Sequence, residues 1–280
     1  MKKLKSFSGS PLSLCLFLLV WGAALVTLAV LVSLVLFILV KGLPHLKPSL
    51  FAWEYNSENV SLLPALVNTV LMAGLSLLIA APLGIFAAIY LTEYAKRGSR
   101  LVSIIRITAE TLSGIPSIVY GLFGFLLFAV TFGWSYSLLG GALTLAIMIL
   151  PLIMRTTEEA LKSVPDAYRE GSFGLGAGKM RTIFRVVLPS AVPGILSGII
   201  LSVGRIVGET AALMYTAGTV AGIPGSVMRS GRTLAVHMYM LTNEGLHIDQ
   251  AYGTAAVLLI IAAGINAISG VIAKRFAAKR

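Results

Sequence analysis

Six long apolar stretches constrain the fold of this chain more strongly than any other feature of its sequence. The first, residues 12–40, contains no charged side chain, and about 20 apolar residues suffice for a helix to cross a bilayer. It is longer than the apolar region of a secretory signal, so we interpret it as a retained membrane span. The other predicted spans are residues 63–91, 107–132, 138–154, 191–217 and 251–273.

The composition agrees with this interpretation, because 57% of the residues are apolar, 12% are charged and the mean hydropathy is +0.92. We expect an all-α membrane protein with six transmembrane helices. Residues 1–62 would form the first span and an outer loop, and residues 63–280 a five-helix core with a cytoplasmic loop at 158–190. The single cysteine, Cys15, permits no intrachain disulfide and no cysteine-based metal site.

The distribution of basic residues predicts the orientation in the membrane. Seventeen of the 22 lysines and arginines fall at the two termini and in the second and fourth connections, and four fall on the opposite side. Positive charge in short loops marks the cytoplasmic side, so both termini are expected in the cytoplasm of a prokaryotic cell, with a multi-pass chain in the lipid bilayer of its plasma (inner) membrane. The net charge of +11 is then an orientation signal, and no nucleic-acid partner is expected.

Two polar segments, residues 41–62 and 220–250, are expected on the outer side. They carry Trp53, Tyr55, His237 and other polar or aromatic residues. Segments of this length are often functional surfaces. Solvated connections with aromatic anchors at the membrane interface are the alternative, and the sequence leaves both open.

A glycine-rich stretch at residues 172–182, SFGLGAGKMRT, resembles a phosphate-binding loop at first sight. The P-loop pattern requires glycine at position 173 and serine or threonine at position 180, which are occupied by Phe173 and Met180. The dinucleotide fingerprint requires glycine at position 179, which is Lys179, and a preceding strand. Nucleotide binding by this stretch is therefore not expected.

The same region carries signals for two short helices. Ser163 is suited to cap the first, with Pro165 in its first turn and Asp166 at its third position. Glycines at 174–178 then provide a break. A second helix is expected to place apolar residues on one face and basic residues on the other, and Pro189 and Pro193 are expected to separate it from the next span.

The sequence EGSFGLGAGKMRTIFRVVLP, residues 170–189, resembles the EAA loop of ABC importer permeases, whose pattern is E-A-A, three residues, G, nine residues and I-x-L-P. The matching positions are Glu170, Gly171, Ser172, Gly176, Val186, Leu188 and Pro189. The resemblance implies a coupling helix that docks on a separate cytoplasmic ATPase. The implied coupling residues are Tyr168, Arg169, Glu170, Gly171, Ser172, Gly176, Leu188 and Pro189. An amphipathic hairpin at the membrane surface is the alternative.

Two charged residues, Arg205 and Glu209, lie four positions apart within the fifth predicted span, and are expected on one helix face. Charge within a membrane is costly and usually faces a cavity or a partner. Arginine offers a forked donor suited to oxyanions, although an internal ion pair that holds helices together is the alternative. Small residues at every fourth position favour close helix packing: Gly194, Gly198 and Ser202, then Gly204, Gly208 and Ala212.

Three further stretches, residues 68–94, 109–124 and 205–213, together with the coupling loop, resemble the A-type permease subunits of phosphate-specific ABC importers. The resemblance implies the type I (MetI-like) permease fold, and it places Arg205 on the phosphate path with Glu209 beside it. Ser113, Ser117 and Tyr120, near Pro116, are further candidates for lining the path. Hydroxyls bonded within their own helix are the alternative for these three.

The function implied by the resemblance is import of inorganic phosphate driven by ATP. Its implied partners are a second homologous permease, two copies of a cytoplasmic ATPase and an external phosphate-binding protein. The chain itself would hold no cofactor and would not be an enzyme, because ATP and Mg²⁺ belong to the ATPase. An ABC permease for sulfate, molybdate or phosphonate and a self-sufficient ion-coupled carrier are the alternatives. A membrane enzyme is disfavoured, because all three histidines lie in the outer segments.

Overall fold

The computed structural model describes residues 11–96 and 98–277, and within these ranges the chain is helical and contains no strand. The basic residues Lys2, Lys3, Lys5, Arg97, Lys279 and Arg280, which entered the orientation argument, lie outside the described residues. The α-helices are α1 (Pro11–Gly42), α2 (Leu63–Ile89), α3 (Arg100–Ser113), α4 (Ser117–Gly124), α5 (Leu138–Lys162), α6 (Asp166–Gly174), α7 (Lys179–Thr182), α8 (Leu188–Val207), α9 (Ala211–Thr216), α10 (Leu234–Glu244) and α11 (Ile248–Ala277).

Shorter helical segments join these elements. Two of them, η2 (Leu43–His45) and η3 (Pro48–Phe51), are 3₁₀ turns, and three are π-helical: η4 (Tyr90–Tyr94), η5 (Phe125–Thr131) and η6 (Ile183–Val187). Among the described residues, five helices are long and apolar enough to cross a membrane, or six if the bent pair α3 and α4 forms one span. The expected all-helical architecture is therefore confirmed.

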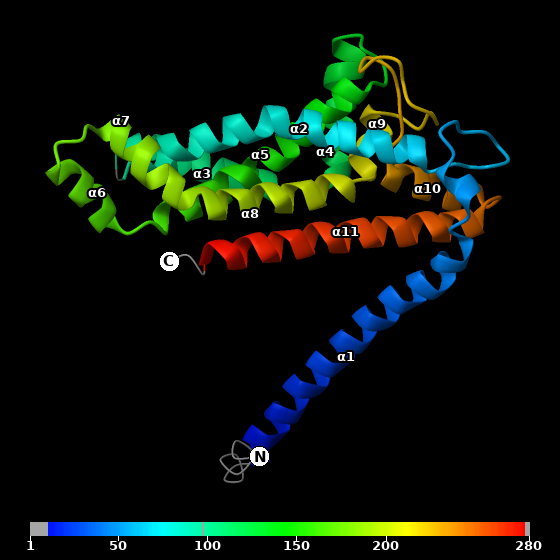
Figure 1. Cartoon of the computed structure of the whole chain (residues 1–280), viewed down its shortest axis with the longest axis horizontal. Coiled ribbons are helices and arrows are strands. Elements are labelled where there is room, and N and C mark those ends of the chain that lie inside the picture. Colours follow the sequence, from blue (N-terminus) through cyan, green and yellow to red (C-terminus); the bar gives the residue numbers. More distant parts are fainter. Residues whose placement is uncertain (1–10, 97, 278–280) are drawn as a thin grey trace.

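The bundle is built around α5, which packs against α2 on one side and α8 on the other. Leu145 and Ile149 of α5 and Met72 of α2 are fully buried and belong to the same main hydrophobic core. α11 lies along α8, and α1 meets α11 near Gly42 and then diverges from the bundle (Figure 1). Apolar side chains along α1 are exposed, as expected for a helix that faces lipid.

Small residues permit the close packing of α8 on α5, as the four-residue repeat predicted. A side-chain carbon at Gly194 would collide with Ala160, and one at Gly198 would collide with Thr156. The second half of the repeat does not pack on α5. The nearest neighbour of a carbon at Gly204 is 4.0 Å away, whereas Ala212 of α9 is fully buried and lies so close to α4 that a side-chain carbon at Gly121 would collide with it.

The predicted third span is broken at Pro116. α3 and α4 meet there at an angle of 101°, because proline cannot donate the helical hydrogen bond to the carbonyl of Leu112. That carbonyl instead accepts hydrogen bonds from the backbone N–H of Ile115, at 3.1 Å, and from the hydroxyl of Tyr120, at 2.8 Å. The break is therefore a stable part of the fold.

Two predictions about the fifth span were wrong. Pro189 and Pro193 do not separate the second loop helix from the span, because α7, η6 and α8 form one continuous helix from Lys179 to Val207. The wider π turn of η6 precedes Pro189, and proline is tolerated in the first turn of α8. The helix then ends at Gly208, so the predicted span 191–217 is divided between α8 and α9.

The fourth span is longer than predicted. α5 continues beyond position 154 to Lys162, with Leu161 fully buried. The loop predicted at 158–190 therefore begins inside a helix, and Ser163 ends α5 instead of capping the next helix. Its hydroxyl donates to the carbonyl of Ala160, at 2.8 Å.

The two ends of the bundle differ in structure. α6 and α7 lie at one end, toward which the C-terminal end of α11 also points, and α10 lies at the other (Figure 1). At the α10 end, His237 is fully buried and its ring meets Tyr55 edge-on, with centroids 6.1 Å apart. The Arg232 guanidinium lies 4.7 Å from the centre of the Tyr55 ring. These contacts join residues from the two predicted outer segments in one packed unit.

Candidate functional site

A helix, a glycine turn and a second helix form the tip of the α6 end, as the sequence predicted. α6 begins at Asp166 and ends at Gly174, and the chain then turns through Gly176, whose φ of +82° is a left-handed conformation that favours glycine. α7 begins at Lys179. The hydroxyls of Ser172 and Thr182 are 2.9 Å apart and join the two helices.

The tip presents apolar side chains to its surroundings. Leu175 is 91% exposed, Met180 68%, Tyr168 51% and Phe173 47%. Of these, only Tyr168 was predicted as a coupling residue. Exposed apolar groups that cluster on a polar loop indicate a surface for a protein partner. Gly174, at the end of α6, was a signal for the exposure of Leu175, which follows it in the turn between α6 and α7.

The remaining predicted coupling residues fall into three groups. Glu170, Gly171 and Gly176 are exposed at the tip. Leu188 and Pro189 lie at the start of α8, within the continuous helix. Arg169 differs from all of them, because its side chain is only 15% exposed and points into the protein.

Arg169 is engaged by three elements. Its Nη2 is 2.7 Å from Oε1 of Glu93 in η4, and it also donates to the carbonyl of Leu161, at 3.0 Å. Its Nη1 donates to the carbonyl of Val164, at 2.8 Å. The guanidinium is thus fully occupied by groups of its own chain.

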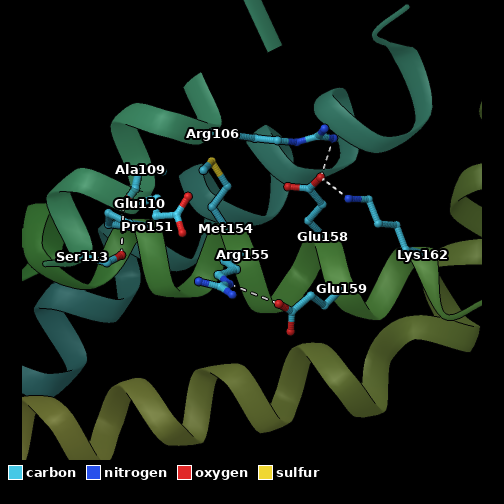
Figure 2. A pocket seen from close by; sticks show the side chains of 10 residues that line it. All are labelled: Arg106, Ala109, Glu110, Ser113, Pro151, Met154, Arg155, Glu158, Glu159 and Lys162. Carbon is cyan, nitrogen blue, oxygen red and sulfur yellow. Dashed lines mark hydrogen bonds and ion pairs between the residues drawn. The ribbon is translucent and has the colours of Figure 1, made fainter. Parts of the chain in front are cut away.

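A charged cavity of about 210 Å³ lies between α3 and α5 (Figure 2). Glu158, whose side chain is 8% exposed, forms ion pairs with Arg106 of α3 and with Lys162, which lies one turn further along α5. Arg155 pairs with Glu159 at 3.1 Å, and both are well exposed. A site that binds and releases an anion would need arginine or lysine side chains, together with acidic groups that limit the affinity of the site for the anion.

A second cavity, of about 580 Å³, adjoins the first. Arg106 and Lys162 line both cavities, so the Glu158 ion pairs lie where the two meet. The sequence argument missed this arrangement, because Arg155 and Glu158 were assigned to a loop. The available signal was the spacing of four residues between Arg155 and Glu159 and between Glu158 and Lys162, which places oppositely charged side chains on one face of a continuing helix.

The predicted pair Arg205 and Glu209 is not a pair on one helix face. Arg205 is the third-last residue of α8, and Glu209 lies beyond its end. The Glu209 carboxylate accepts a hydrogen bond from the backbone N–H of Ala212, at 3.0 Å, and so supports the start of α9. In the described part of the chain no ion pair joins the two side chains.

The three hydroxyl residues that were predicted to line the path do not lie at one site. Tyr120 is 4% exposed and lies within the electrostatic reach of Arg205. Ser113 lines the charged cavity, and its hydroxyl donates to the carbonyl of Ala109 in its own helix, at 3.0 Å. Ser117 begins α4 directly after the break. The structure thus brings Tyr120 and Arg205 together and places Ser113 in the other site.

A bundle of helices long and apolar enough to cross a membrane, with an exposed helix pair at one end, is the architecture of a multi-pass membrane protein. The chain belongs to the family described as binding-protein-dependent transport system inner membrane components, whose model matches residues 80–280. Membership confirms the family that the EAA-like loop indicated.

Curated relatives support a narrower similarity. The chain is 35% identical over 260 residues to the probable ABC transporter permease protein YqgI of Bacillus subtilis, covering 85% of this chain and 86% of that one. It is 38% identical to the phosphate transport system permease protein PstA 1 of Mycobacterium tuberculosis H37Rv, covering 77% and 70%. It is 41% identical to PstA of Pasteurella multocida, covering 65% and 66%.

Solved structures confirm the fold. A chain of the MetNI methionine ABC transporter in an inward-facing conformation matches with a TM-score of 0.60 at 20% identity, covering 86% of this chain and 97% of that one. A chain of a bacterial alginate ABC transporter, solved with an alginate-bound periplasmic protein, matches with a TM-score of 0.59 at 19% identity, covering 91% and 96%. The chain therefore has the fold of ABC importer permeases.

Proposed function

We propose that this chain is a transmembrane subunit of an ATP-driven importer of inorganic phosphate, and that it couples to a separate ATPase through α6 and α7. The exposed apolar tip formed by Tyr168, Phe173, Leu175 and Met180 carries the coupling part of the proposal. Such a surface is costly in water, and burial against a cytoplasmic partner offsets that cost.

The proposed orientation places the α6 end in the cytoplasm of a prokaryotic cell, with both termini on the same side of the inner membrane. Basic residues at this end support the proposal, since positive charge is retained on the cytoplasmic side. The described ones are Lys96, Arg100, Arg106, Arg155, Lys162, Arg169, Lys179, Arg181, Arg185, Lys274 and Arg275.

Phosphate is the proposed substrate because several relatives are phosphate transport permeases. Arg205, half-buried next to Tyr120, would be the first cationic contact on the path, and the cavity with Arg106 and Arg155 a second one nearer the α6 end. A guanidinium can donate two parallel hydrogen bonds to an oxyanion. Glu209 would act near this path by holding the turn between α8 and α9 in place.

The proposed assembly contains a second homologous permease, two ATPase copies and an external phosphate-binding protein. ATP and Mg²⁺ would be held by the ATPase, so that this chain needs no cofactor of its own. Closure of the ATPase on ATP would displace α6 and open the path outward, and hydrolysis would restore the inward-facing state.

Radiolabelled phosphate uptake into vesicles that contain the reconstituted complex tests the proposal. We expect uptake that requires ATP, survives excess sulfate or molybdate, and is abolished by Arg205→Ala. Stronger competition by sulfate or molybdate would assign the chain to another oxyanion. Uptake by the chain without an ATPase would make it a self-sufficient carrier.

A further inference from the structure

One buried ion pair connects the coupling helix to the bundle. No residue of α6 is buried, yet the side chains of Arg169 and Glu93 are only 15% and 8% exposed. Glu93 belongs to η4, the π-helical turn that ends the long α2 helix. The contact therefore joins segments that are 76 positions apart in the sequence.

The geometry of this pair restricts it to arginine. Nη2 of Arg169 lies 2.7 Å from Oε1 of Glu93, and Nε lies 3.3 and 3.4 Å from the two carboxylate oxygens. The other donors bind the carbonyls of Leu161, in the last turn of α5, and of Val164, just beyond its end, and Nη1 also donates to Oδ1 of the exposed Asp166 in α6, at 3.2 Å. A lysine could reproduce the charge but not this set of directed bonds.

Other contacts between the tip and the bundle are weaker. Lys179 of α7 lies 4.9 Å above the ring of Tyr94, the neighbour of Glu93 in η4, and Tyr94 is 44% exposed. A cation over an exposed ring contributes little. Both helices of the tip thus meet the same π turn, and only α6 does so through a desolvated, directed contact.

We propose that Arg169 is a positioning residue that transmits displacement of α6 to the α2 and α5 helices through Glu93 and the carbonyls at the end of α5. The proposal rests on the proposed function, since it requires an ATPase that moves α6. In it, Arg169 contacts the transporter's own helices and not the ATPase. π turns often accompany functional movement, because their hydrogen bonds can be rearranged within the helix.

The test uses the complete complex in sealed vesicles, with the variants Arg169→Gln, Arg169→Lys and Glu93→Gln. Three quantities are measured for each variant: the ATPase that copurifies with the chain, the rate of ATP hydrolysis, and the phosphate imported per ATP hydrolysed. We expect unchanged copurification and a fall in phosphate per ATP on the order of tenfold in each variant, the scale of a typical coupling between sites. The double variant Arg169→Gln with Glu93→Gln should be no worse than either single variant, because the two residues act as one unit.

Arg100→Gln is the matched control, since this arginine is exposed at the start of α3. It should transport as the wild type does. Should Arg169→Gln fail to fold, Arg169→Lys can replace it in the comparison with the wild type, because lysine keeps the positive charge but lacks the directed donors of the guanidinium.

Normal phosphate import per ATP in the Arg169 and Glu93 variants would overturn the proposal. Loss of copurifying ATPase in Arg169→Gln would also overturn it, by assigning Arg169 to docking. A wild-type complex without ATP-dependent import would instead overturn the proposed function, and the inference with it.

Discussion

The hydroxyl of Tyr120 donates to the carbonyl oxygen of Leu112, 2.8 Å away, and so ties α4 to the end of α3 across the break at Pro116; the backbone N–H of Ile115 donates to the same oxygen, at 3.1 Å. The break between α3 and α4 therefore leaves this acceptor satisfied. An unsatisfied carbonyl inside an apolar bundle would be costly.

Tyr120→Phe should lower the free energy of unfolding by about 1 kcal/mol, the contribution of one hydrogen bond inside the protein, since the Leu112 carbonyl keeps the backbone N–H of Ile115 as a donor, at 3.1 Å. Thermal unfolding of the purified chain in detergent measures the change. Tyr90→Phe is the control, since Tyr90 is 50% exposed, and it should change stability by less than about 0.5 kcal/mol. Equal stability of the two variants would show that the Tyr120 hydroxyl does not support the break.

The packing of α8 on α5 predicts opposite effects at two glycines. Gly198→Ala should destabilise by about 1–3 kcal/mol, because the new carbon collides with Thr156. Gly204→Ala has open space and should be neutral or stabilising by up to about 1 kcal/mol, because alanine favours the helix. Detergent-based unfolding titrations compare the two, and a stabilising Gly198→Ala would contradict the close contact.

Stability at the α10 end should depend on pH through His237. α10 is not among the helices long enough to span a membrane, and burial lowers the pKa of His237 to about 3, with a further contribution from the charge of Arg232. The backbone of Val60 opposes the shift, although neither ring nitrogen makes a hydrogen bond of normal geometry. The neutral ring is therefore the form that the fold accepts.

Since the unfolded chain takes up this proton at about pH 6.5 and the folded chain only near pH 3, stability is retained above pH 6.5 and lost between these values. The loss approaches about 1.4 kcal/mol per pH unit. Melting temperatures of the wild type and of His237→Phe between pH 7 and pH 4 provide the measurement. The variant should show the shallower decline, and parallel curves would refute the assignment.

Leu175 should matter for the ATPase and not for folding. Its side chain is 91% exposed, so Leu175→Asp should leave the melting temperature unchanged while weakening association with the ATPase by on the order of tenfold, as for a residue at the centre of an interface. Leu246→Asp, at an equally apolar position near the α10 end that is 80% exposed, is the control. Copurification and direct binding measurements distinguish the two. Equal ATPase binding by both variants would remove Leu175 from the interface.

Much of the fold could be predicted from apolar runs, because membrane-spanning helices satisfy their backbone groups internally and depend little on distant residues. The glycines in the coupling loop also located the break between α6 and α7 correctly, whereas the third span was predicted as one helix and is bent at Pro116. Helix ends were predicted less well. Pro189 was expected to end a helix, but it follows a π turn and the helix continues through it. Gly208 lies within an apolar run that was predicted as one span, yet α8 ends there.

The sequence indicated which types of residue form the candidate site, but not how their side chains are arranged. Arg169 matched a family motif, but its inward direction depends on Glu93, which is distant in sequence and could not be identified as its partner. Glu158 was placed in a loop, and its burial depends on α3 lying beside α5. Contacts between remote segments decide such details, and no local pattern contains them.

Glu158 already forms ion pairs with Arg106 and Lys162 where the two cavities meet. A free anion that enters must compete with this carboxylate, which is held in place by the chain and never diffuses away. Such competition shortens the residence time of any anion between the cavities, so that this region favours rapid passage over storage.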